Sequence, residues 1–182
     1  PGLGKGSGVT EVVRTVLVNS KNPVIVDADA INTLAENMDI LSECSCDLIF
    51  TPHTAEMSRL TGLEIEYIET NRLVVSKEFS EEYGAVLILK GHHTVVTAPD
   101  LVQYINITGN PGLAKGGSGD VLAGITAALA AKGIEAASAA AAAVYIHGAA
   151  ADKAAETISM ESMTAAEVIE CISPVMKRIT GR

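Results

Sequence analysis

The sequence contains 182 residues, and the 48% that are hydrophobic are enough to form the core of one domain. Its 13 basic and 22 acidic residues give a net charge of −9, which repels nucleic-acid phosphates and anionic lipids. We therefore expect neither nucleic acid nor a membrane as a partner. The three cysteines, Cys44, Cys46 and Cys171, fit neither a zinc spacing nor a disulfide framework and predict reduced thiols in a cytoplasmic protein.

Short β-branched runs alternate with helical patterns along the first half of the chain. The order is a strand at 24–26, a helix at 31–41, a strand at 47–50, a short helix closed by Gly62, a charged helix at about 66–83 and an apolar strand at 85–91. Two shorter strands, joined near Pro99 and Asp100, follow as a hairpin. This alternation is typical of βαβ units on a mostly parallel sheet with helices on both faces.

The second half of the chain is predicted to be helical, at about 118–131, 135–154 and 164–178. The most apolar stretch, residues 136–151, is mostly alanine and shorter than the roughly 20 apolar residues that span a membrane, which favours a helix of a soluble domain. The chain opens on PGLGKGSG, which is typical of a turn leading into a helix within a sheet, with no strand before it. We therefore expect a single domain over residues 1–182 that is incomplete at its N-terminus.

Polar residues follow the ends of the three predicted parallel strands. Asp27 and Asp29 come after the first strand, Thr51 to His53 after the second, and Lys90 to His93 after the third. Ligands of parallel sheets bind at the carboxyl ends of the strands, so these residues should share one rim.

Six glycines stand among the sixteen residues of GNPGLAKGGSGDVLAG, at positions 109–124. The segment Gly116-Gly117-Ser118-Gly119 precedes a predicted helix, whose free N–H groups and positive dipole end favour an anion such as phosphate. The same dipole stabilises Asp120 as the anion, which can accept a proton from a hydroxyl that attacks phosphorus. A helix cap by Asp120 or Ser118 is the commoner role for such residues, but it does not explain the glycines.

Three other polar residues each have two interpretations. His53 is either a packed or surface histidine or a ligand contact at a strand tip. Lys90 either extends to solvent or, as we favour, contacts a phosphate, with Gly91 opening the backbone beside it. His147, inside an alanine-rich helix, is interpreted as structural.

Four motifs, in order, resemble those of the ADP/ATP-dependent NAD(P)H-hydrate dehydratases, members of the ribokinase-like superfamily. They are PVIVDADAIN, FTPHTAEMSRLTG, VLILKGHHTVV and GNPGLAKGGSGDVLAG, and PGLG resembles the glycine turn of the family. The similarity covers essentially the whole chain. It implies a ribokinase-like three-layer α/β sandwich, with a mostly parallel sheet between helices and an alanine-rich helical segment at the C-terminus.

The resemblance also implies a metabolite-repair reaction. Members of the family act on NADH or NADPH that has gained water across a ring double bond. They convert the resulting hydroxyl into a phosphate ester with ADP or ATP as phosphoryl donor, and elimination of phosphate restores the reduced cofactor. Mg²⁺ is expected from phosphate chemistry, although the sequence contains no convincing ligand set for it.

Carried over by position, the resemblance makes Asp120 the catalytic base. It implies that the adenine nucleotide and the transferred phosphate contact Lys90, Gly91, His92, His93, Thr94, Gly116, Gly117, Ser118 and Gly119. Contacts to the hydrated dinucleotide are implied for Gly2, Gly4, His53, Asn110 and Asp120.

Some features depart from the family pattern. Ser118 stands where threonine is usual, Ala55 replaces a glycine, and Lys115 replaces a small polar residue and adds a cation near the phosphates. The family's domain also begins before the PGLG turn, so we expect the missing segments to belong to a longer protein or to a second chain.

Two other functions fit the same residues. A ribokinase-like kinase for a small alcohol, of the hydroxyethylthiazole or pyridoxal type, would share the anion hole and Asp120 but release a stable phosphate ester. A non-catalytic fragment would only bind nucleotide or stabilise an oligomer. A homo-oligomer is also expected, because the alanine-rich helices offer a packing face.

Overall fold

The apolar runs of the sequence form one five-stranded sheet in the computed structural model, which describes residues 1–181. The strands are β1 (Val24–Val26), β2 (Leu48–Phe50), β3 (Val86–Leu89), β4 (Val95–Thr97) and β5 (Gln103–Ile105), and they lie in this order across the sheet. β1, β2 and β3 pair in parallel, whereas β4 is antiparallel to both β3 and β5. β5 therefore runs in the same direction as β1 to β3, and the predicted mostly parallel sheet and its terminal hairpin are confirmed.

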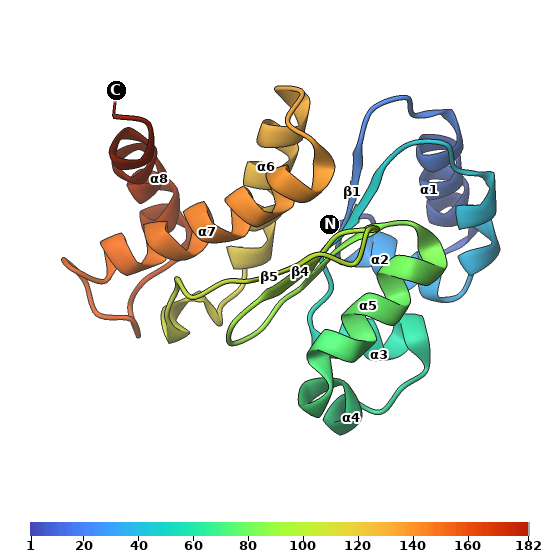
Figure 1. Ribbon diagram of the computed structural model, residues 1–182, viewed down its shortest axis with the longest axis horizontal. Helices are drawn as coiled ribbons and strands as arrows, with labels where there is room; N and C mark the ends of the chain where they lie inside the picture. The colour runs from blue at the N-terminus through green and yellow to red at the C-terminus, as the bar shows by residue number, and fades with distance from the viewer. Residues whose placement is uncertain (182) are drawn as a thin grey trace.

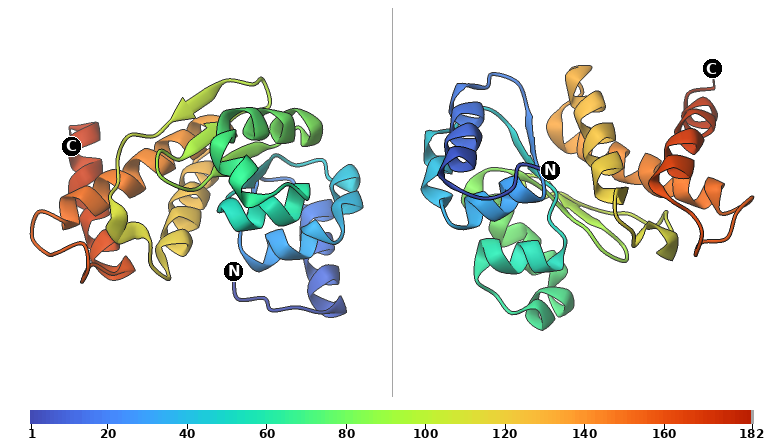
Figure 2. Two further views of the ribbon diagram at one scale, coloured as in Figure 1. Left: turned by 90° about the horizontal axis from the view of Figure 1, so that it is seen from below. Right: turned by 180° about the vertical axis from the view of Figure 1, so that it is seen from behind.

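Helices cover both faces of the sheet, as Figures 1 and 2 show. One layer contains α1 (Ser7–Asn19), α2 (Asp29–Ala35), α3 (Thr54–Thr61), α4 (Ile65–Thr70) and α5 (Arg72–Tyr83), with the 3₁₀ helix η1 (Met38–Glu43). The other contains α6 (Ser118–Ala131), α7 (Ala136–Ala154) and α8 (Ala165–Thr180). A second 3₁₀ turn, η2 (Pro111–Leu113), precedes α6.

The alternation of side chains along the strands divides the interior into two hydrophobic cores. In β2, Leu48 and Phe50 pack with the helices α1 to α5, whereas Ile49 points to the other face and packs with α6 and α7. The second core is built mainly from alanines of α7, including Ala139, Ala140 and Ala143, which are fully buried. Their small side chains let α7 lie close to α6 and α8, which both pack against it.

Two predicted helices are interrupted, and asparagine stands at both breaks. The helix predicted at 66–83 is two helices separated at Asn71, and the one predicted at 31–41 ends at Ala35 before η1 begins at Met38. Asn71 Nδ2 donates to the Tyr67 carbonyl at 2.9 Å, and Asn37 Nδ2 donates to the Thr33 carbonyl at 2.8 Å. These side chains hydrogen bond to the last turn of the preceding helix, while their own backbones leave the helical conformation.

The other helix ends agree with the sequence analysis. α3 is followed by Gly62 in the left-handed conformation, with φ of 72°, and α6 has the predicted bounds. α7 and α8 begin directly after Glu135 and Thr164, whose side chains accept hydrogen bonds from the first turns. The three cysteines are unpaired, as predicted. Among residues 1–181, no helix is both long and apolar enough to cross a membrane.

Candidate active site

A cavity of about 940 Å³ lies at the carboxyl edge of the sheet. Its walls come from the end of β3, the long segment between β5 and α6, the first turn of α6 and the middle of α7, together with the start of α3. Ten of the residues predicted for the site line it: His53, Lys90, Gly91, His92, His93, Thr94, Asn110, Gly116, Ser118 and Gly119. The residues after β2 and β3 and the glycine-rich stretch therefore share this cavity, whereas Asp27 and Asp29, which follow β1, do not line it.

The start of α6 has the geometry of an anion site. Gly117 is the N-cap residue in the left-handed conformation, with φ of 87°, and no side chain caps the helix. The first N–H groups of α6 are therefore free of side-chain acceptors, and the helix dipole adds positive potential at the same end. The alternative that Ser118 or Asp120 serves as the cap is wrong.

Asp152, on α7, holds the loop before α6 in place. Asp152 accepts hydrogen bonds from the Gly109 N–H at 2.8 Å and from Asn110 Nδ2 at 3.1 Å. Asn110 Oδ1 in turn accepts from the Gly112 N–H at 3.0 Å, which forms the η2 turn. Asn110 is thus fixed from two sides at the cavity wall.

A buried ion cluster connects three elements beside this anion site. Lys90 Nζ lies 3.1 Å from Asp27 Oδ1 and 3.7 Å from Glu56 Oε2, and both carboxylates are buried. Asp27 also accepts a hydrogen bond from Thr51 Oγ1 at 2.7 Å. A Cβ atom added at Gly119 would lie 3.5 Å from Lys90 Nζ, so the ammonium adjoins the first turn of α6.

The strand-tip position of Lys90 predicts a phosphate contact, but it does not reveal the two carboxylate partners. Asp27 was recognised only as a strand-tip residue and Glu56 was not singled out. Their spacing along the chain gives no signal that the three charged groups meet.

Arg72, at the start of α5, supports the backbone after β3. Its guanidinium donates to the Leu89 carbonyl at 2.6 Å and to the Lys90 carbonyl at 3.4 Å, and burial lowers its pKa. A Cβ atom at Gly91 would lie 2.8 Å from Arg72 Nη1, and Gly91 has φ of 153°. The positive φ favours glycine at position 91, and a Cβ atom there would also force the end of the Arg72 side chain to move.

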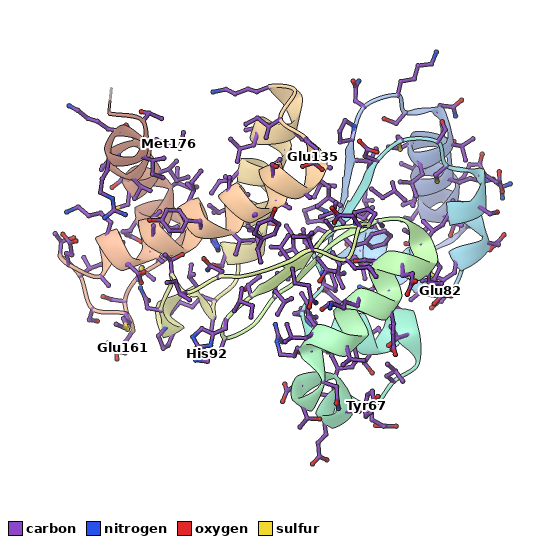
Figure 3. The ribbon with its side chains drawn as sticks, in the orientation of Figure 1. Tyr67, Glu82, His92, Glu135, Glu161 and Met176 are labelled. Atoms are coloured by element: carbon purple, nitrogen blue, oxygen red, sulfur yellow. The ribbon has the colours of Figure 1, made fainter. Side chains whose placement is uncertain are left out.

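The three predicted site histidines lie at the cavity in different ways. His53 Nδ1 accepts from the Glu56 N–H at 3.2 Å and caps α3, and about half of the side chain remains exposed. The rings of His92 and His93 stack with their centroids 3.9 Å apart. Figure 3 shows His92 at the lower edge of the view, on the turn between β3 and β4.

Four predicted residues do not line the cavity: Gly2, Gly4, Gly117 and Asp120. The Gly4 N–H donates to Asp29 Oδ2 at 2.9 Å, which fixes the N-terminal turn at the start of α2, next to the end of β1. Asp120 is exposed in the first turn of α6, directly after Gly119, and belongs to none of the ion pairs among residues 1–181. Its carboxylate is exposed and is not paired with a cation from residues 1–181.

Lys115 has a different position from the one expected. Its ammonium donates to the backbone carbonyls of Met160, Glu161 and Met163, which form the connection between α7 and α8. All three N–H donors are thereby used within the protein. The side chain ties the glycine-rich loop to this connection and is not free to donate to a phosphate.

His147, interpreted from the sequence as structural, lies in the cavity wall. Burial lowers its pKa to about 4, a backbone hydrogen bond at Ser118 works in the opposite direction, and the charge of Lys90 lowers the pKa further. The imidazole is therefore neutral at neutral pH. The glycine next to it, Gly148, marks the point where the segment containing Thr108 approaches α7 closely. A Cβ atom at Gly148 would lie 2.3 Å from Thr108 Oγ1.

The described residues contain no cluster of side chains that would supply most of the ligands of a divalent cation. Among residues 1–181, no three histidine, cysteine, aspartate or glutamate side chains are arranged to hold a metal ion. The two buried carboxylates nearest the anion site, Asp27 and Glu56, are already paired with Lys90. A magnesium ion bound mainly by nucleotide phosphates and water would need no such protein ligand set.

Solved structures of the ribokinase-like superfamily have the same fold as this chain. The chain superimposes on a ribokinase-like superfamily protein from Enterococcus faecalis with a TM-score of 0.80 and 28% identity, covering 98% of this chain and 61% of the other. It also superimposes on the ADP/ATP-dependent NAD(P)H-hydrate dehydratase of Bacillus subtilis, co-crystallised with ATP and Mg²⁺, with a TM-score of 0.87 and 33% identity. That match covers 98% of this chain and 62% of the other. The three-layer ribokinase-like fold is thus confirmed.

Residues 1–174 match the model of the NAD(P)H-hydrate dehydratase family, and the chain belongs to that family. It is 41% identical over 179 residues to the bifunctional NAD(P)H-hydrate repair enzyme Nnr of Moorella thermoacetica, covering 98% of this chain and 34% of the relative. It is 38% identical to the ADP-dependent (S)-NAD(P)H-hydrate dehydratase of Neisseria meningitidis, covering 98% and 62%, respectively. The chain therefore spans about a third of the bifunctional relative and less than two thirds of the dehydratase.

Proposed function

We propose that the protein catalyses the nucleotide-dependent dehydration of hydrated NADH or NADPH to the reduced cofactor. The observation that carries this proposal is the single cavity shared by the glycine-rich loop, the segment Lys90–Thr94 and His53. Membership of the family and the names of the relatives supply the substrate class, which the cavity alone does not.

The proposed reaction begins with phosphoryl transfer. The N–H groups at the start of α6 bind the terminal phosphoryl group of ADP or ATP, and the hydroxyl of the hydrated nicotinamide ring attacks its phosphorus. The bond from phosphorus to the leaving AMP or ADP breaks, and Asp120 accepts the hydroxyl proton. The Lys90 ammonium, next to Gly119, stabilises the negative charge on the phosphoryl oxygens.

Elimination then restores the ring. The lone pair of the ring nitrogen expels phosphate by breaking the carbon–oxygen bond, and loss of a proton from the neighbouring ring carbon regenerates the double bond. The products are NADH or NADPH, inorganic phosphate and the shortened nucleotide. Mg²⁺, arriving with the nucleotide, would neutralise part of the phosphate charge.

The exposed carboxylate of Asp120 gives the direct test of this mechanism. Asp120→Asn should abolish formation of reduced nicotinamide from hydrated NADH and ADP or ATP, because it removes the base. It should leave nucleotide affinity within about twofold, because surface substitutions that preserve the backbone cause little change. Reduced nicotinamide is followed by its absorbance and nucleotide affinity by calorimetry.

A matched control is Asp39→Asn, which neutralises another exposed acid in the first turn of a helix, η1, away from the cavity. It should turn over normally. Normal turnover by Asp120→Asn would refute the assignment of the base. Accumulation of a stable phosphorylated alcohol, with no gain of reduced nicotinamide, would favour a small-molecule kinase instead.

We further propose that the chain forms a homo-oligomer in the cytoplasm. Support for association comes from the edge strand β5 and the residues after it, where Tyr104, Ile105 and Ile107 are exposed. The unpaired cysteines agree with a reducing compartment. Light scattering during size-exclusion chromatography measures the mass directly, and a monomer at micromolar concentration would overturn the first point.

A further inference from the structure

One buried polar side chain of the cavity has no part in the reaction described above. His147 lies in the middle of α7, with only 8% of its surface exposed. Its neighbours Val144 and Gly148 also line the cavity, so this turn of α7 forms part of the wall. A buried polar group requires a hydrogen-bond partner, and this position raises the question of which group that is.

The partner in reach is the first residue of α6. His147 Nε2 lies 3.5 Å from the Oγ atom of Ser118, which is also buried and also lines the cavity. Ser118 stands between the N-cap Gly117 and Gly119, within the predicted anion hole. The contact therefore joins the anion site to α7, two elements that share one cavity.

Which of the two groups donates depends on the tautomer of the imidazole. A hydroxyl has one proton, so Ser118 can donate to a bound anion only if it does not donate to the histidine. A neutral imidazole has one N–H group and one acceptor nitrogen, and the tautomer is set by its surroundings. An Nε2–H group would donate to Oγ and leave the hydroxyl proton directed at the cavity. The nearby Lys90 ammonium disfavours a second positive charge at this place.

We propose that His147 is a positioning residue that donates a hydrogen bond from Nε2 to Ser118 Oγ and thereby directs the Ser118 hydroxyl at the phosphoryl group. The identity of the anion rests on the proposed function, whereas the hydrogen bond does not. His147 acts through Ser118 and does not itself touch the substrate.

The tautomer can be determined without any ligand. The chain has four histidines, so the imidazole ¹⁵N resonances are few, and His147→Gln identifies those of residue 147. At neutral pH the proposal requires the Nε2–H tautomer, and Ser118→Ala should shift the Nε2 resonance. An Nδ1–H tautomer, or an Nε2 resonance insensitive to Ser118→Ala, would overturn it.

Nucleotide binding supplies the second measurement. His147→Leu removes the donor, whereas the amide of His147→Gln can place an N–H group near the position of Nε2. We expect His147→Leu and Ser118→Ala each to weaken ADP binding about tenfold, as loss of a hydrogen bond to a charged group does. The double variant should be no weaker than either single variant, and His147→Gln should recover most of the affinity. The proposal would be contradicted if the losses of ADP affinity in the two single variants multiplied in the double variant. It would also be contradicted if His147→Gln bound ADP no more tightly than His147→Leu.

A structural role for this part of α7 is tested by Ile146→Ala. Ile146 is buried on the same helix but does not line the cavity. The substitution should lower stability and leave ADP affinity unchanged. If the unmodified chain binds no ADP, the proposed function fails. The ¹⁵N measurement of the tautomer still tests whether His147 donates a hydrogen bond to Ser118.

Discussion

Lys90, a partly buried lysine directly after β3, illustrates how single residues shape the anion site. Lys90 is one cation between two buried carboxylates, Asp27 and Glu56, so the cluster has one negative charge left over. Removing one partner from a buried ion pair leaves the other charge desolvated and uncompensated. The cluster therefore keeps the ammonium beside Gly119, where it can meet an incoming phosphate.

Lys90→Met should destabilise the protein by about 3 kcal/mol, because two carboxylates would stay buried without a cation. It should also weaken nucleotide binding. The loss of stability is measured by urea unfolding, with Lys132→Met, an exposed lysine at the end of α6, as the control. Equal stability of the two variants would contradict the importance of the cluster.

The low pKa of His147 predicts a pH dependence of stability. The folded-state pKa is about 4, below the ordinary value of 6.5, so the unfolded chain binds the proton more readily. The contribution of this group to the free energy of unfolding should therefore fall as the pH drops from 6.5 towards 4, by on the order of 3 kcal/mol.

Other acids also titrate in that range, so the informative quantity is the difference between two proteins. The unmodified chain should lose more stability between pH 6.5 and 4 than His147→Gln does, as measured by denaturation at each pH. Parallel pH profiles would show that the pKa of His147 is not lowered in the folded state.

At the scale of elements, two helical glycines form a natural pair for comparison. Gly148, on α7, lies directly against Thr108, whose backbone atoms would be 2.6 and 2.7 Å from an added Cβ. Gly124, on α6, has no atom within 4 Å of that position. Identical substitutions at the two sites should therefore have opposite effects.

Gly148→Ala should displace the segment that contains Thr108 from α7 and deform the cavity, with a loss of about 2 kcal/mol in stability, typical of overpacking. Gly124→Ala should gain up to about 1 kcal/mol from helix propensity alone. Thermal unfolding and ADP affinity of both variants provide the comparison. A Gly148→Ala variant with normal affinity would mean that this wall does not shape the binding site.

The boundaries of helices and strands were predictable from the sequence where neighbouring residues determine them. The start of α6 at Ser118 follows from the change from glycine to alanine-rich sequence, and the first two strands end where Asp27 and Pro52 predict. The third strand was predicted over residues 85–91 but ends at Leu89. The breaks at Asn37 and Asn71 were not foreseen, because they depend on side-chain hydrogen bonds that compete with a favourable helical pattern.

The site was predictable to the extent that topology brings strand ends together. The rim formed by His53, Lys90 and the glycine-rich loop required only parallel strands. The pairing of Lys90 with Glu56, and the contact of His147 with Ser118, depend on the distances between packed elements. No spacing along the chain encodes these distances.

At the scale of the whole molecule, the cavity is built from both helical layers. His53 and Thr54 come from the layer of α1 to α5, and His147 and Gly148 from the layer of α6 to α8. The two layers are separated by the sheet and have separate hydrophobic cores. A ligand in the cavity should therefore contact both halves of the molecule.

ADP at a hundred times its dissociation constant should raise the free energy of unfolding by ~2.7 kcal/mol, as expected for a ligand that binds only the folded state. Both layers should be protected together in hydrogen exchange. Protection confined to α6 and α7 would place the nucleotide on one layer only. AMP, which lacks a transferable phosphoryl group, serves as the comparison ligand.

The aromatic residues are distributed very unevenly between the two cores. The chain has no tryptophan, and both phenylalanines, Phe50 and Phe79, lie with Tyr83 on the side of α1 to α5, where their rings are in contact. Near-ultraviolet circular dichroism will therefore report mainly on that side, because the only aromatic residue of α6 to α8 is the exposed Tyr145. Tyr145→Trp would place the single tryptophan of the chain on α7, at a residue whose carbonyl accepts a hydrogen bond from Thr108, and selective excitation of its indole would follow the unfolding of the other half.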